Sequence, residues 1–82
     1  MAVVAFDLFH SIIVSDDGSM FVSVEVNRGE NHQTTRAAAR RYVAQELGPL
    51  WSLGSFVSLD HYRRRDGHPA VARVYVVNFT GR

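Results

Sequence analysis

The chain has 82 residues, a formal net charge of +1, no cysteine and 46% hydrophobic residues. This length supports a single domain, residues 1–82, and leaves little room for a multi-step active site around a buried cofactor. The absence of cysteine excludes disulfides and thiolate metal sites. All nine basic side chains are arginine, which reflects either a GC-rich genome or selection for planar, bidentate contacts.

The longest apolar run lies near the N-terminus, and Asp7 and His10 interrupt it. A membrane-spanning helix needs roughly 18 or more consecutive apolar residues, and a signal peptide has its own charged and apolar regions. Neither pattern is present. We therefore expect a soluble, cytoplasmic protein that makes no membrane contact.

Two segments with alternating apolar residues open the chain, Val3–Val14 and Met20–Arg28. Alternation is typical of strands with one buried face. A three-residue loop, Asp16–Gly18, aligns their apolar sets by pairing Val14 with Met20, Ile12 with Val22 and Leu8 with Val26. A two-residue turn would send the two sets to opposite faces, so we predict the three-residue loop.

The segment Thr34–Leu47 has helical periodicity, with Ala39, Val43 and Leu47 on one apolar stripe. Asn31 or Thr34 is expected to cap its start, and Gly48 and Pro49 to end it. Leu50 and Trp51 follow and are expected to close one end of the core.

Two further strands, Phe56–Arg65 and Ala70–Thr80, are predicted around an Asp66-Gly67 turn. A two-residue turn pairs Leu59 with Val74 on one face and Asp60 with Arg73 on the other. The resulting prediction is an α+β fold in the order β-β-α-β-β. It consists of a four-stranded antiparallel sheet with one helix packed on one face.

One helix covers one face of such a sheet, and the predicted registers leave many aromatic residues on the other. Exposed apolar patches of this kind mark interaction surfaces in soluble proteins. Alternatively, the N-terminal strand bends over part of the patch, or the patch forms a ligand groove. Arginines at the second hairpin would add an electrostatic contact to a partner. The predicted partner-binding residues are Phe9, Phe21, Tyr62, Tyr75, Phe79, Arg63, Arg64 and Arg65.

A second hypothesis is RNA or DNA binding by two arginine clusters that contact phosphates. The strand–loop–helix segment from Met20 to Leu47 is similar to the end of a double-stranded-RNA-binding domain. That resemblance implies phosphate contacts from the basic helix start, where the family's lysine pair corresponds to Thr35 and Arg36. The predicted nucleic-acid contacts are Arg36, Arg40, Arg41, Arg63, Arg64 and Arg65.

A third hypothesis follows from the order strand, helix and two strands between Val22 and Phe79, which resembles dodecins. That resemblance implies a flavin-binding oligomeric shell in which Trp51 stacks on the flavin. The alternative role for Trp51 is packing at the end of the core.

No Ser-His-Asp order, paired carboxylates, phosphate-cradling glycine loop or metal-ligand spacing is present. We therefore expect no catalysis, no metal and no cofactor. The first hypothesis is a non-enzymatic protein–protein interaction module that forms a homodimer or binds a partner protein. Its small size and lack of a catalytic constellation would suit an inhibitor encoded by a phage or mobile element, such as an anti-CRISPR protein.

Overall fold

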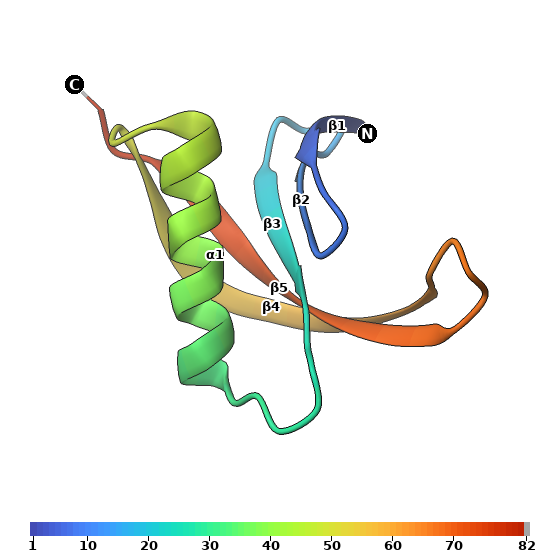
Figure 1. Cartoon of the computed structure of the whole chain (residues 1–82). Helices are drawn as coiled ribbons and strands as arrows, with labels where there is room; N and C mark the ends of the chain where they lie inside the picture. Colours follow the sequence, from blue (N-terminus) through green and yellow to red (C-terminus); the bar gives the residue numbers. More distant parts are fainter. Residues whose placement is uncertain (82) are drawn as a thin grey trace.

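The computed structural model describes residues 1–81 and has one helix packed against one face of an antiparallel sheet (Figure 1). The α+β prediction is confirmed, but the sheet has five strands instead of four, in the order β1-β2-β3-β5-β4. The elements are β1 (Ala2–Phe6), β2 (His10–Val14), β3 (Met20–Glu25), α1 (His32–Leu47), β4 (Trp51–Arg63) and β5 (Pro69–Phe79).

The extra strand arises because the N-terminal segment reverses direction at Leu8 and Phe9. The backbone amide of Asp7 donates a hydrogen bond to the His10 carbonyl at 2.9 Å, and β1 pairs antiparallel with β2 at the edge of the sheet. The predicted continuous strand Val3–Val14 is therefore wrong, and so is its pairing of Leu8 with Val26. A period-2 pattern continues through a tight reversal, so the pattern alone does not reveal the turn.

The first predicted hairpin and the helix are confirmed. Val14 pairs with Met20 and Ile12 with Val22, as the three-residue loop requires. The Asn31 side chain accepts a hydrogen bond from the Thr34 amide and caps α1. At the other end, Gly48 has a φ of 86°, a left-handed conformation that favours glycine.

The β4–β5 register differs from the prediction by one residue. The Arg64 amide donates to the His68 carbonyl at 2.9 Å, which leaves three loop residues, Arg65–Gly67, in place of two. Asp60 consequently pairs with Ala72, and Leu59 pairs with Arg73. Two irregularities in β4, between Leu53 and Phe56 and between Phe56 and Ser58, shift the register further along the strand.

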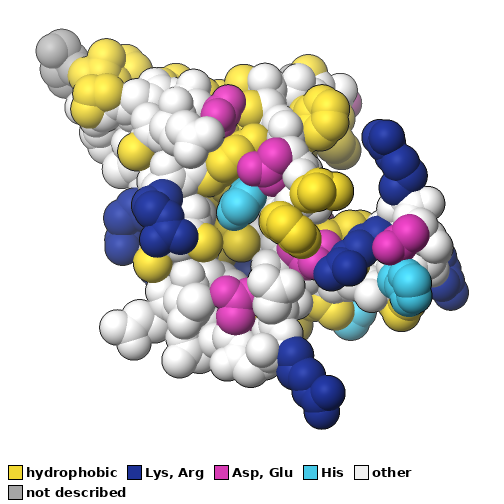
Figure 2. All heavy atoms as spheres, in the orientation of Figure 1, with side chains coloured by type: hydrophobic (Ala, Val, Ile, Leu, Met, Phe, Trp, Pro, Cys, Tyr) yellow, Lys and Arg dark blue, Asp and Glu magenta, His cyan; other side chains and the backbone are white. Residues whose placement is uncertain are grey.

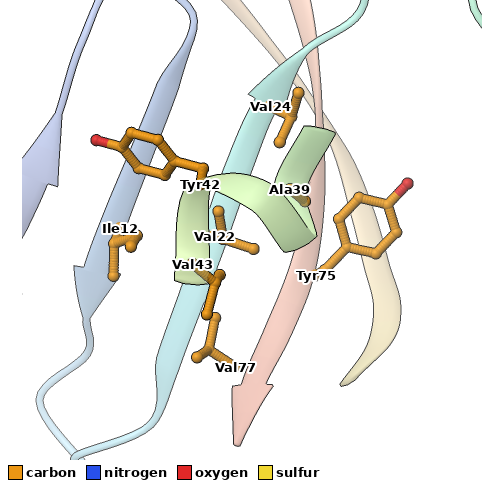
Figure 3. Close-up of a cluster of buried hydrophobic side chains, with 8 residues drawn as sticks. All are labelled: Ile12, Val22, Val24, Ala39, Tyr42, Val43, Tyr75 and Val77. Atoms are coloured by element: carbon orange, nitrogen blue, oxygen red, sulfur yellow. The ribbon is translucent and has the colours of Figure 1, made fainter. Parts of the chain in front are cut away.

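Apolar side chains from three strands and α1 form the core (Figure 3). β3 aligns Val22 with Tyr75 of β5, so both side chains face the helix. Tyr75 is fully buried there. Trp51, at the start of β4, packs against this core, as one of the two interpretations of its role expected. The buried cluster comprises Ile12, Val22, Val24, Ala39, Tyr42, Val43, Tyr75 and Val77.

The distal half of the β4–β5 hairpin extends beyond the helix as an arm (Figure 1). We call residues 60–70 the arm. No helix within residues 1–81 is long and apolar enough to cross a membrane.

Candidate protein-binding groove

An exposed apolar loop lies between β1 and β2. The exposed fractions of Phe6, at the end of β1, and of Leu8 and Phe9 in the loop are 72%, 85% and 46%. One oxygen of Asp7 accepts hydrogen bonds from the Phe9 amide at 2.8 Å and the His10 amide at 2.7 Å. These bonds order the backbone that presents Leu8 and Phe9, which limits the entropy lost when the two side chains bind.

His10 connects this loop to α1. Its Nδ1 lies 2.9 Å from the Asp7 carboxylate, and its ring stacks on Tyr42 of α1 with centroids 4.7 Å apart. Burial raises the pKa of Asp7, but the hydrogen bonds from Phe9 and His10 outweigh it and hold that pKa below its ordinary value. The loop is thus anchored through an ionised carboxylate.

A buried carboxylate joins the arm to the sheet face that α1 leaves uncovered. Glu25 at the end of β3 is 3% exposed and accepts a hydrogen bond from the Tyr62 hydroxyl at 2.6 Å. Arg64 Nε donates to the same carboxylate at 3.0 Å and forms an ion pair with it. A buried charge requires such partners, because leaving it unpaired is costly.

These contacts shift the titration of the groups involved. The hydrogen bond from Arg64 is the main cause that lowers the pKa of Glu25, against the opposing effect of desolvation. Desolvation, and then the hydrogen bond to Glu25, raise the pKa of Tyr62 to about 12. At neutral pH the network therefore holds an ionised Glu25, a neutral Tyr62 and a charged Arg64.

A groove separates the β1–β2 loop from the arm, and we call it the loop–arm groove. Its volume is about 650 Å³, and a smaller hollow of about 410 Å³ adjoins the same loop and Tyr62. The loop–arm groove is lined by Phe6, Asp7, Leu8, Phe9, Tyr62, Arg63, Arg64, Arg65 and Asp66.

The lining combines apolar side chains with three arginines and two aspartates, and Arg64 is already paired with Glu25. The Asp7 carboxylate is occupied by its own loop, and Asp66 accepts a hydrogen bond from the His68 amide at 3.0 Å. Arg63 donates to the Gly67 carbonyl at 2.9 Å. Within residues 1–81, the Arg65 side chain makes no hydrogen bond or ion pair, so its donors remain available to a ligand.

The structure separates the residues predicted for partner binding. Phe9, Tyr62 and the three arginines of the arm line one groove. Phe21 is half-buried outside that groove, and Phe79 stacks edge-on with Trp51, with centroids 4.9 Å apart. Placing Tyr75 at a partner surface is wrong, because its side chain is fully buried beneath α1.

Sequence reasoning missed Phe6 and Leu8 as groove residues. The alternating pattern predicts one continuous strand, Val3–Val14, that includes both residues. The available signal was Asp7, since an aspartate can accept hydrogen bonds from amides two residues ahead and so favours a turn.

The predicted nucleic-acid contacts form no single cluster. Dark-blue side chains gather beside α1 and at the arm, with other surface between them (Figure 2). Arg40 and Arg41 are exposed on α1. Arg36 is half-buried and donates to the Gly54 carbonyl at 3.0 Å.

The chain matches no protein-family model, no curated protein and no solved structure. Residues 1–81 contain no group of three or more His, Cys, Asp or Glu side chains placed to hold a metal ion.

Proposed function

We propose that the protein is a non-enzymatic protein-binding module whose docking site is the loop–arm groove. The observation that carries the proposal is the exposure of Phe6 at the end of β1 and of Leu8 on the following loop, in which the Asp7 carboxylate accepts two backbone hydrogen bonds. Large apolar side chains on an ordered loop are typical of interaction hot spots, because burying them releases water at little conformational cost.

The charges of the groove specify the partner's chemistry. Arg65 has donors that nothing within residues 1–81 satisfies, while the groove's aspartates are occupied by local hydrogen bonds. A complementary segment therefore carries a large apolar side chain flanked by carboxylates. Such a module would act by covering part of a larger protein, as an inhibitor encoded by a phage or mobile element would. An anti-CRISPR protein would be one example.

The test selects binders from a random peptide library displayed on phage and then measures their affinities in solution. We expect selected peptides to combine aromatic or aliphatic residues with Asp or Glu. Leu8→Ser and Arg65→Ala should each weaken binding by about tenfold or more. The matched controls are Leu50→Ser, at a residue that is 53% exposed, and Arg40→Ala on the outer surface of α1.

Three results would count against this proposal. Selected peptides without acidic residues would contradict an acidic partner. Affinities that Leu8→Ser and Arg65→Ala leave unchanged would show that the loop–arm groove is not the docking site. Analytical ultracentrifugation provides the second test. A wild-type dimer that Leu8→Ser converts to a monomer would assign the groove to a second copy of the chain, in place of an acidic partner.

A further inference from the structure

Two arginines approach Tyr75 on the helix-covered side of the sheet, opposite the face where Glu25 lies. Arg73 of β5 donates from Nη1 to the Thr35 hydroxyl at 3.1 Å, and that hydroxyl lies 2.8 Å from the Tyr75 hydroxyl. The Arg36 guanidinium lies over the Tyr75 ring, 5.2 Å from its centroid. Two cations from different elements, Arg36 of α1 and Arg73 of β5, thus lie close to the Tyr75 side chain.

No carboxylate balances these cations. The ion pairs within residues 1–81 include neither Arg36 nor Arg73. Nε of Arg73 is buried and has no hydrogen-bond partner, an arrangement that costs free energy unless another group compensates. The first turn of α1 lacks acidic residues, so the partial positive charge of the helix start adds to the same local potential.

The cluster also has guanidinium donors without a partner. Arg36 and Arg73 are both half-buried. Apart from the bonds to the Gly54 carbonyl and the Thr35 hydroxyl, their guanidinium groups make no hydrogen bond within residues 1–81. Guanidinium groups bind phosphate and carboxylate oxygens through such planar donors.

Apolar surface borders the two cations. The Phe56 ring is 41% exposed and packs against the His32 ring, with centroids 4.8 Å apart. Leu59 pairs with Arg73 in the β4–β5 register and is 51% exposed. A ligand whose anionic group contacts the arginines would have an apolar surface beside it.

We propose that Arg36 and Arg73, positioned by the buried side chains of Thr35 and Tyr75, form a binding site for a small molecule that carries a phosphate or carboxylate group next to an apolar part. We call this cluster the oxyanion site. It shares no residue with the loop–arm groove, so it goes beyond the proposed protein-binding function, and the two are tested by different variants.

The experiment titrates the ¹⁵N-labelled protein with sodium phosphate or sodium acetate at constant ionic strength and follows amide and arginine Nε–H signals by NMR. We expect saturable shifts at Arg36, Arg73, Thr35 and Tyr75. Arg36→Gln should weaken the preferred anion by about tenfold, as expected for loss of a charged hydrogen bond. The matched control, Arg40→Gln, replaces an exposed arginine one turn along α1 and should leave the affinity unchanged.

Saturation by phosphate assigns a phosphate-bearing ligand, whereas saturation by acetate alone assigns a carboxylate. Shifts that never saturate and extend equally to Arg40 and Arg41 would overturn the proposal, as would an affinity that Arg36→Gln does not change. If Arg36→Gln unfolds, Arg36→Lys keeps the charge without the planar donors and should still weaken binding. Binding of single-stranded DNA that Arg40→Gln and Arg36→Gln weaken equally would overturn the small-molecule site in favour of a nucleic-acid surface.

Discussion

The hydroxyl oxygens of Thr35 and Tyr75 lie 2.8 Å apart although the residues are 40 positions apart in the sequence. This buried hydrogen bond joins the first turn of α1 to β5, which lies between two other strands. The Thr35 hydroxyl also lies 3.2 Å from the carbonyls of Asn31 and His32. The contact therefore links the capped start of the helix to the middle of the sheet.

Tyr75→Phe should lower the free energy of unfolding by about 1–2 kcal/mol, because it removes a buried hydroxyl partner and retains the ring. Urea unfolding followed by circular dichroism measures the change. Ser55→Ala, which removes an exposed hydroxyl that makes no hydrogen bond within residues 1–81, is the control and should change little. An equal loss in the two variants would contradict the importance of the Thr35–Tyr75 contact.

Glu25 should make the protein sensitive to acid. Its pKa in the folded state is lowered from 4.5, chiefly by the hydrogen bond from Arg64. A lowered pKa stabilises the fold above about pH 4.5, and this contribution is lost as the pH falls through the folded-state pKa. Glu25→Gln should thus be less stable at neutral pH and show a shallower fall in stability below pH 4.5.

Urea unfolding midpoints measured at a series of pH values would test the Glu25 prediction. The control is Glu46→Gln, at an exposed glutamate of α1. Because Asp7, Asp17 and Asp66 also have lowered pKa values, some acid dependence remains in every variant. Identical pH profiles for the wild type and Glu25→Gln would show that the Arg64–Glu25 pair does not contribute.

The Tyr62 hydroxyl should lose its proton at a higher pH than that of an ordinary tyrosine. Its pKa is raised from 10.0 to about 12, first by desolvation and second by its hydrogen bond to Glu25. The associated stabilisation is fully present below pH 10 and is lost as the pH rises through the folded-state value. The ultraviolet absorbance of the phenolate, compared between the wild type and Tyr62→Phe, isolates this residue. Glu25→Gln should lower the pKa of Tyr62, and a value near 10 in the wild type would contradict the hydrogen bond between Tyr62 and Glu25.

Asp7 is expected to order the apolar loop rather than to stabilise the core. Asp7→Ala removes the acceptor of the Phe9 and His10 amides, so hydrogen exchange at those two amides should accelerate by about tenfold. Exchange at Ile12 and Val22, which lie in the core, should change much less. The variant should also bind a selected peptide more weakly, since the loop must then be ordered upon binding. Unchanged exchange at Phe9 would refute this role.

Local chemistry determined the helix and the first hairpin. The helical stripe with its Asn31 cap and Gly48 end is complete within one segment, and aligning Ile12 with Val22 requires only that both apolar residues face the same side. These features depend on neighbouring residues and on turn geometry, which a sequence displays directly.

Tertiary packing decided where the candidate surfaces lie. Asp66-Gly67 is compatible with a two- or a three-residue loop, and β5 is rich in valine on both faces, so its side-chain pattern does not select one register. Packing of Tyr75 beside Val22 and against α1 fixes which residues of β5 face the helix. The three-residue loop then pairs Leu59 with Arg73.

At the N-terminus, the bonds to Asp7 and the pairing of β1 with β2 fold one alternating segment into two strands and expose Phe6 and Leu8. The sequence alone thus determined the helix and the first hairpin, whereas the surface formed by the arm and the apolar loop depends on contacts between distant segments.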